Sequence, residues 1–296
     1  MPENVGEDIC VDEKMIGEDF YTVISNRTTG KIAFMANTTK STELVEACSP
    51  IKEELKKVRL LNRDLASCYR SFGNIATPAA AQTGDKFHVV KLLLEAQQSV
   101  RISQKRKIET EKRETHKVFK DSEKKRKDEC QKTGGKFKKQ KFVYKEKTLI
   151  NGETPSEILR RSRYLLYKFP EQWTDKQAAR AKVLFLEFPV LEEAYKLSNK
   201  FRDWYSKKNI GEHKLFLEKG LYQWYDDVER SGITELMNFS STVERNQEYI
   251  LNYFYHKGAS NAMAENRNGK IKKFINSNQG TRDRDFFFFR LNKYFT

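Results

Sequence analysis

Five short runs of strand-forming residues within the first 85 residues constrain the fold more than any other feature of the chain. The first three are separated by short polar segments, one of which ends in a turn at Gly30, and they predict three antiparallel strands. The runs are 9–12, 20–25, 31–36, 58–61 and 79–83, with helical patterns over 42–57 and 65–72. This order of three strands, helix, strand, helix and strand predicts an α/β core built on a mixed sheet.

Three of these runs lead to an aspartate, at Asp12, Asp64 and Asp85. If the first and fourth strands are parallel neighbours, the carboxylates of Asp12 and Asp64 fall at the same edge of the sheet, within reach of one ion. Taken singly, each aspartate is more commonly a strand-end or turn residue. Asp85 is either a fourth acid near the metals or a hydrogen-bonded cap of its strand.

A third carboxylate is predicted on a helix near the C-terminus, over residues 260–275. At about 100° per residue, its apolar side chains gather on one arc that faces a core, and Glu265 lies on the neighbouring arc with Asn261 and Asn268. A frayed polar helix face is the simpler explanation for such an arc in isolation. Combined with the first two aspartates, however, Glu265 completes an all-oxygen set that suits two Mg²⁺ or Mn²⁺ ions about 4 Å apart.

Charge indicates the kind of partner. The 296-residue chain has a net charge of +15 and interspersed aromatic residues, which favours nucleic acid over an anionic membrane surface. No apolar run approaches the roughly 20 residues that cross a bilayer, and no signal peptide precedes the first strand, so we expect a soluble, cytoplasmic, nucleoid-associated protein. The four cysteines are scattered without C-x-x-C spacing, which argues against a zinc site and against disulfides.

The middle of the chain is expected to be an α-helical insertion. Lysine, arginine and glutamate dominate residues 91–147, a pattern typical of a solvated helix or a mobile arm, and the excess of cations suits contacts with phosphate. Capping boxes are predicted at 154–157, 174–177 and 241–244. The expected parts of the chain are 1–91 for the sheet, 92–240 for the basic and helical insertion, and 241–296 for C-terminal helices that complete the core.

The motifs around these acids resemble those of DDE transposases of bacterial insertion sequences, in the ISL-three branch. Residues 85–89, DKFHV, match the D-[RK]-F-H-V signature of the family, and residues 260–268 are similar to its N-A-x-A-E motif. Residues 11–13 and 64–67 correspond to its first two acidic motifs, and 280–290 closes the pattern. The resemblance covers almost the whole chain, from Ile9 to the C-terminus.

The resemblance implies an RNase H-like α/β fold with a large helical insertion before the last catalytic helix. It also implies Mg²⁺- or Mn²⁺-dependent cleavage and strand transfer at transposon ends, by a multimer assembled on double-stranded DNA. The implied catalytic and metal-binding residues are Asp12, Asp64 and Glu265. Accessory candidates are Asp85, His88, Asn261 and Asn268, and candidates for DNA contact are Lys86, Lys270, Lys272, Lys273, Arg282 and Arg290.

Alternatives stay open for several of these residues. His88 could contact the scissile phosphate, although a buried histidine that orients a loop is more common. The arginines Arg282 and Arg290 either clamp DNA phosphate or pair with nearby aspartates. Tryptophans could stack on an unpaired base, while packing between helices accounts for at least two of the three. These tryptophans are Trp173, Trp204 and Trp224.

Two other functions also stay open: a non-catalytic DNA-binding relative that kept the fold, and a nuclease that cuts without joining. The intact acids favour the enzyme. Asn62 and Arg63, at positions where a buried central strand should be apolar, and the alanine- and glycine-rich segment 79–84 favour the degenerate relative. Because the chain begins almost at its first strand, recognition of transposon ends is expected from the insertion, from a separate DNA-recognition protein, or from a missing segment.

Overall fold

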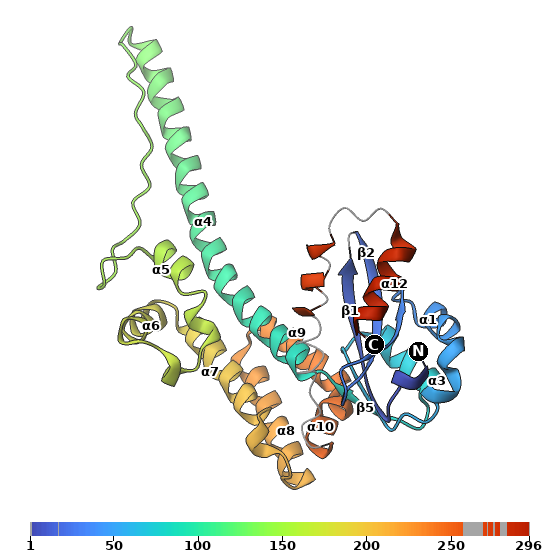
Figure 1. The fold of residues 1–296 in the computed structure, drawn as a ribbon. Coiled ribbons are helices and arrows are strands. Elements are labelled where there is room, and N and C mark those ends of the chain that lie inside the picture. Colours follow the sequence, from blue (N-terminus) through green and yellow to red (C-terminus); the bar gives the residue numbers. More distant parts are fainter. Residues whose placement is uncertain are drawn as a thin grey trace. The chain divides into compact units, whose positions relative to one another are not determined.

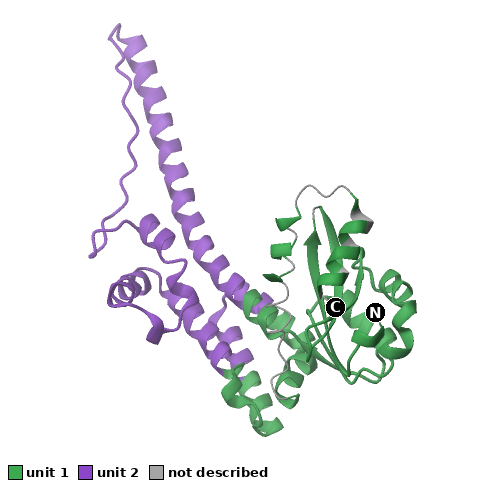
Figure 2. Ribbon diagram, viewed as in Figure 1, with its two compact units in different colours: residues 1–92, 204–222, 240–296 green, residues 93–203, 223–239 purple. Residues whose placement is uncertain are grey.

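A computed structural model describes residues 2–16, 18–256, 269–270, 272–274, 276–278 and 283–295. The chain forms two compact units (Figure 2). The first unit consists of residues 1–92, 204–222 and 240–296, and the second of residues 93–203 and 223–239. Part of the segment expected as an insertion, residues 204–222, therefore belongs to the unit that contains the sheet.

A five-stranded mixed sheet forms the centre of the first unit, with the order β3-β2-β1-β4-β5 (Figure 1). The strands are β1 Asp8–Ile16, β2 Asp19–Asn26, β3 Ile32–Ala36, β4 Leu60–Arg63 and β5 Ala81–Gly84. β1 pairs antiparallel with β2, and β2 with β3, whereas β4 lies parallel to both β1 and β5. The predicted RNase H-like α/β fold is confirmed.

Three short helices enclose the larger core against one face of the sheet (Figure 1). They are α1 Ser41–Ala47, α2 Lys52–Leu55 and α3 Ser67–Ala76, with 3-10 turns at Pro2–Asn4 and Ser49–Ile51. Ile9, Val11 and Leu61 share this face, because alternate residues of a strand point to the same side. They pack with Tyr69 and Phe72 of α3 and are almost fully buried, which holds β1 and β4 side by side.

The C-terminal helix α12, Arg284–Phe295, covers the opposite face of the sheet (Figure 1). Val23 of β2 is buried there together with Leu291 of α12. Val23 is also the antiparallel partner of Asp12 in β1, and directly opposed residues of neighbouring strands share a face. Asp12 therefore lies on the face of the sheet that the C-terminal segment covers.

Helix α10, Gln247–Tyr255, packs against β5, the edge strand of the sheet. Its Asn252 donates a hydrogen bond from Nδ2 to the carbonyl oxygen of Gln82, at 2.9 Å. At Gly84, a Cβ atom would approach Cδ2 of Leu65 to 2.9 Å, so a larger residue at the end of β5 would have to displace the Leu65 side chain. Cover by α10 and the small residues of β5 explain how a segment with weak strand propensity forms an ordered edge.

The second unit is helical, and its residues 93–203 and 223–239, all described, contain no strand. A long helix, α4, supplies its first part, and Trp224 packs on Phe201 in its interior, with ring centroids 4.8 Å apart. The helices that lie wholly or partly in this unit are α4 Lys86–Lys132, α5 Pro155–Arg161, α6 Asp175–Glu187, α7 Pro189–Trp204, α8 Lys214–Ser231 and α9 Thr234–Arg245. Three 3-10 turns are Leu165–Tyr167, Pro170–Gln172 and Lys207–Asn209, the last in the first unit.

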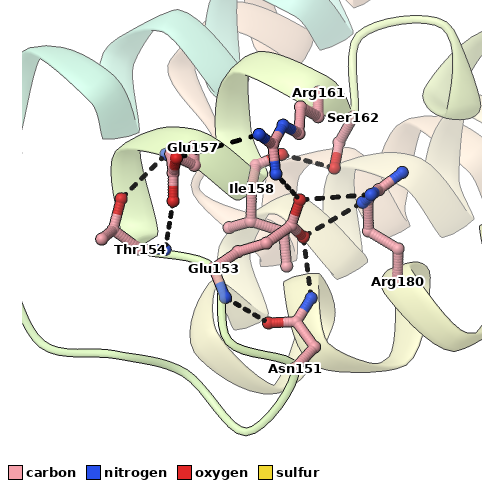
Figure 3. A network of polar contacts seen from close by, with 8 residues as sticks. All are labelled: Asn151, Glu153, Thr154, Glu157, Ile158, Arg161, Ser162 and Arg180. Atoms are coloured by element: carbon pink, nitrogen blue, oxygen red, sulfur yellow. Dashed lines mark hydrogen bonds and ion pairs between the residues drawn. The ribbon is translucent and has the colours of Figure 1, made fainter.

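A polar network fixes the start of α5 (Figure 3). The Thr154 hydroxyl accepts from the Glu157 backbone N–H at 3.3 Å, and the Glu157 carboxylate accepts from the Thr154 N–H at 3.0 Å. Next to this capping box, the buried Glu153 carboxylate accepts from Arg161 at 2.7 Å and from Arg180 at 3.0 and 3.2 Å. The network ties α5 to α6, because Arg180 belongs to α6.

The capping boxes predicted at 154–157 and 174–177 are confirmed. The one predicted at 241–244 is wrong, because α9 begins at Thr234 and runs through these residues to Arg245. A Ser/Thr-x-x-Glu spacing is also compatible with a helix interior, where serine hydroxyls bond to carbonyl groups of the preceding turn.

An extended segment returns along the distal part of α4. After α4 the chain turns at Gly134, which has a φ of 69°. Residues 136–147, which we name the strap, then hold three half-buried aromatic side chains against the helix. Phe142 stacks on His116 with ring centroids 4.5 Å apart, Tyr144 lies beside Lys112, and Phe137 lies beside Arg126. Six lysines of the strap are exposed: Lys136, Lys138, Lys139, Lys141, Lys145 and Lys147.

None of the helices in the described part of the chain combines the length and the apolar character needed to span a bilayer.

Candidate active site

The register of three parallel strands brings three aspartates to one row of the sheet. Val11 of β1 is paired with Arg63 of β4, and Arg63 is paired with Gly84 of β5. The next residue in each strand direction is an aspartate, namely Asp12, Asp64 and Asp85. Each aspartate is thus the first residue beyond the parallel pairing. Because the pairing keeps one register across the three strands, the aspartates lie in one row.

Asp12 does not end its strand, which corrects the prediction for this residue. β1 continues to Ile16, where it pairs only with β2, so Asp12 marks the end of the parallel pairing with β4 and not the end of the strand. The residue is 8% exposed, and its Oδ1 accepts a hydrogen bond from the Glu13 backbone N–H at 2.8 Å. A carboxylate is thus held in a nearly buried position on the face covered by the C-terminal segment.

Asp64 and Asp85 each lie one residue beyond a short strand. The Asp64 side chain is one-third exposed, and its Oδ1 accepts from the Leu65 backbone N–H. Asp85 is buried and caps α4, since its carbonyl oxygen accepts from the Val89 N–H at 3.1 Å and its Oδ1 accepts from the Phe87 N–H at 3.3 Å. These contacts make Asp85 a cap of α4, and its role as a fourth acid near the metals stays a prediction.

His88, in the first turn of α4, lies between two of these carboxylates. Its Nδ1 is 2.7 Å from Oδ2 of Asp85, and its Nε2 is 4.0 Å from Oδ2 of Asp64. The hydrogen bond with Asp85, together with the negative charges of Asp64, Asp85 and Asp12, raises the pKa of His88 above its usual 6.5, although burial acts in the opposite direction. The charges of all three aspartates therefore act on the pKa of the imidazole.

Lys86 lies in an aromatic environment beside this row. Its Nζ is 5.4 Å from the ring centroid of Tyr205 and 5.0 Å from that of Tyr253, and 3.3 Å from the Tyr253 hydroxyl. Burial lowers the pKa of Lys86 to about 8, and the charge of Lys207 acts in the same direction. The two aromatic faces offset part of the cost of burying this ammonium.

Sequence reasoning missed the structural role of Arg63. This residue is completely buried in β4, and burial lowers the pKa of its guanidinium to about 10, so it stays protonated at neutral pH. Its partners come from β5 and α10, and no local pattern in the sequence connects those segments with β4. Only a polar residue in an otherwise apolar central strand could have drawn attention to it.

The comparisons with known proteins decide the family. The family model for ISL-three (ISL3) DDE transposases, described as transposase, matches residues 9–291. The chain belongs to this transposase family. No curated protein and no solved structure matches the chain.

Several predicted site residues of this transposase lie outside the described residues. Glu265, Asn261, Asn268 and Arg282 are among them, as is most of the helix expected at 260–275. Within the part of the chain that is described, no three His, Cys, Asp or Glu side chains are grouped as metal ligands. The convergence of Asp12, Asp64 and Glu265 therefore stays a prediction.

The remaining candidates for DNA contact lie in the C-terminal segment of the transposase. Lys270, Lys272 and Lys273 are exposed. The exposed Arg290 has its guanidinium 6.0 Å from the ring centroid of Phe274. Each of these cations is thus accessible to a polyanion, and their contact with DNA stays a prediction.

The three tryptophans of the transposase are used in helix packing. Trp204 and Trp224 are buried, and their indole N–H groups donate to the carbonyl oxygens of Leu217 and Leu197 at 3.0 and 2.9 Å. Trp173 donates in the same way to a main-chain carbonyl, at 2.9 Å. Because a buried indole N–H usually finds such a partner, these contacts support the packing explanation over base stacking.

Proposed function

We propose that this chain is the catalytic part of a DNA transposase that cleaves DNA strands at transposon ends and joins them to a target. The observation that carries the proposal is the row formed by Asp12, Asp64 and Asp85 just beyond the parallel pairing of β1, β4 and β5. Carboxylates placed side by side on a rigid sheet can share a divalent cation, whose charge offsets their repulsion. Membership of the transposase family supports DNA as the substrate.

The donor set fits Mg²⁺ or Mn²⁺. Asp12 and Asp64 offer hard carboxylate oxygens, and no cysteine takes part in the row of aspartates. In our proposal these two residues hold two ions together with Glu265. When bound, such ions supply Lewis-acid activation of a nucleophile and stabilisation of the leaving oxygen.

The residues of the chain itself have distinct proposed roles around this site. Asp85 fixes the position of His88 through the 2.7 Å contact, and His88 presents Nε2 beside Asp64. A protonated His88 can donate a hydrogen bond to a phosphate oxygen of the DNA, which places the scissile phosphate next to Asp64. His88 and Asp85 thus position the DNA.

The strap and the distal part of α4 are proposed as the surface that holds the DNA backbone. Residues 105–147 contain 18 Lys and Arg but 8 Asp and Glu, so two-thirds of the net charge of the chain is concentrated there. The aromatic residues of the strap are turned to α4 while its lysines are exposed. Such cations bind phosphates without reading sequence.

The proposed complex is a homo-oligomer on double-stranded DNA, and end recognition comes from a separate DNA-recognition protein or another segment. The non-catalytic alternative was based on Arg63 and on the weak strand before Asp85. Both features have structural reasons, since Arg63 donates from Nε to Gln82 and from Nη1 to the Asp64 carbonyl oxygen, and Gly84 at the end of β5 lies close to the Leu65 side chain. These contacts support the catalytic proposal over the non-catalytic alternative.

Cleavage of DNA carrying the sequences that flank the gene tests the proposal. Wild type should cut at the element ends in Mg²⁺, and Asp64→Asn should not, although both bind the DNA. Asp8→Asn is the matched control, because Asp8 lies in β1 but pairs with Arg27 at the partly exposed surface. Cleavage that survives Asp64→Asn, or that is lost equally in Asp8→Asn, contradicts the assignment.

A further inference from the structure

Arg63 is a charged residue at the centre of the sheet, where it is 0% exposed. Its neighbours in the sheet are Val11 of β1 and Gly84 of β5. Burial of a guanidinium is costly unless its donors are bonded and its charge is compensated. The contacts of Arg63 meet part of this cost, through Nε and Nη1, whereas its buried Nη2 has no hydrogen-bond partner among the described residues.

Two contacts hold the far end of the side chain. Nε of Arg63 donates to Oε1 of Gln82 at 2.6 Å, and Gln82 in turn donates from Nε2 to Oδ1 of Asn74 at 2.7 Å. The guanidinium also lies over the ring of Tyr249, with Cζ 4.3 Å from the centroid. Strand β5 and helix α10 thus hold one planar group between them, and helix α3 holds Gln82 in place, which favours arginine over lysine at position 63.

The remaining contact of Arg63 is with a residue of the candidate active site. Nη1 of Arg63 donates to the carbonyl oxygen of Asp64 at 2.8 Å. This carbonyl belongs to the first residue after β4, where ladder hydrogen bonds no longer hold the backbone. On its other side, Asp64 is held by the bond between its own Oδ1 and the Leu65 N–H. The direction of the carboxylate depends on how this peptide is oriented.

We propose that Arg63 is a positioning residue that fixes the main chain at Asp64 and so aims its carboxylate at the bound metal. The proposal rests on the metal-binding role proposed for Asp64. Arg63, whose charge in a central strand favoured the degenerate relative, thus has a function in an intact site. The negative charge of the Asp64 carboxylate also acts favourably on the guanidinium.

Direct binding of Mn²⁺ to the DNA-free protein tests the inference without relying on cleavage. Free Mn²⁺ is measured by electron paramagnetic resonance during a titration of wild type, Arg63→Met and Arg63→Lys. Loss of a group that orients a metal ligand costs about 10- to 100-fold in metal affinity. We expect a weakening of that size for Arg63→Met. A smaller weakening is expected for Arg63→Lys, since an ammonium keeps the charge and can donate to the Asp64 carbonyl but lacks the planar fork of the guanidinium.

Arg70→Met is the matched control. Arg70 lies over the same Tyr249 ring, with Cζ 5.8 Å from its centroid, but it does not donate to the Asp64 carbonyl. This variant should lose some thermal stability and keep wild-type Mn²⁺ affinity. Thermal unfolding of each variant separates loss of fold from loss of metal.

The outcomes distinguish this inference from the proposed function. Wild-type Mn²⁺ affinity in folded Arg63→Met overturns the inference alone, as does an equal weakening in Arg70→Met. If Arg63→Met fails to fold, unchanged affinity in Arg63→Lys overturns it. If wild type binds no Mn²⁺, or Asp64→Asn binds it as wild type does, the metal site and the role of Arg63 are both wrong.

Discussion

His88 Nδ1 lies 2.7 Å from Oδ2 of Asp85, one helical turn earlier in the chain, and its Nε2 lies 4.0 Å from Oδ2 of Asp64. The imidazole thus joins the capping residue of α4 to the carboxylate that ends β4. Because Asp85 is buried and bonded at both its main chain and its side chain, it is a rigid support for the ring.

Asp85→Asn should lower the pKa of His88 toward 6.5, because the hydrogen bond to the Asp85 carboxylate is the main cause of the raised value. A raised histidine pKa contributes stability that is fully present below pH 6.5 and is lost as pH rises through the folded-state value. The contribution should therefore shrink in Asp85→Asn. Titration of the His88 ring by NMR, in metal-free buffer, measures the change, and an unaltered pKa would show that Asp85 does not support the charged ring.

Glu153→Gln should destabilise the second unit by about 1–3 kcal/mol, between the values for exposed and buried ion pairs. The Glu153 side chain is 8% exposed, while Arg161 and Arg180 are 47% and 33% exposed. Burial alone would raise the pKa of Glu153, but hydrogen bonds from Arg180 and Arg161 outweigh this and hold it below 4.5. Its contribution is thus present above pH 4.5 and lost as pH falls through the lower folded-state value.

Urea unfolding at pH 7 and at acidic pH measures the effect of Glu153→Gln. The matched control is Glu192→Gln in the same unit, whose pairing with Lys196 is exposed to solvent. That variant should change the free energy of unfolding by less than about 1 kcal/mol. Equal effects of the two substitutions at pH 7 would show that the network in Figure 3 adds nothing beyond a surface ion pair.

Replacing Lys138, Lys139 and Lys141 of the strap by glutamine should weaken DNA binding for any duplex sequence. Each phosphate contact contributes about 0.9 to the slope of log K against log salt concentration, so the slope should become shallower by up to about 3. The matched control replaces Lys52, Lys56 and Lys57, three exposed lysines of the first unit, by glutamine. If both triple variants lose the same affinity, only net charge matters and the strap is not a specific contact surface.

Local sequence patterns predicted the parts of the fold that depend on residues close together in the chain. Strand-forming runs, their order and the capping box at Thr154 depend on residues close together in the chain, and each was predictable. The length of β1 beyond Asp12 was not, because its continuation depends on pairing with β2 alone. Apolar patterning also misjudged Arg63, since its partners Gln82 and Tyr249 lie in distant segments that meet β4 only in the folded chain.

The candidate site was predictable to a different degree. The three aspartates follow from the ends of the strand-forming runs in the sequence and from family motifs, and their common row follows from the register of β1, β4 and β5. The contact of His88 with both Asp85 and Asp64 could not be predicted from spacing alone, because it depends on α4 beginning immediately after β5. The position of Glu265 relative to this row is the part that the described residues leave to experiment.

Anomalous X-ray diffraction from crystals grown with Mn²⁺ tests the central claim most directly, because it locates the metal without assuming catalysis. The account predicts anomalous peaks within about 2.0–2.6 Å of carboxylate oxygens of Asp12 and Asp64, with Glu265 completing the coordination. The Asp64→Asn variant, crystallised in the same way, should lose at least one of these peaks. Saturating Mn²⁺ that leaves Asp12 and Asp64 without a peak, or that places Glu265 away from them, would contradict the account.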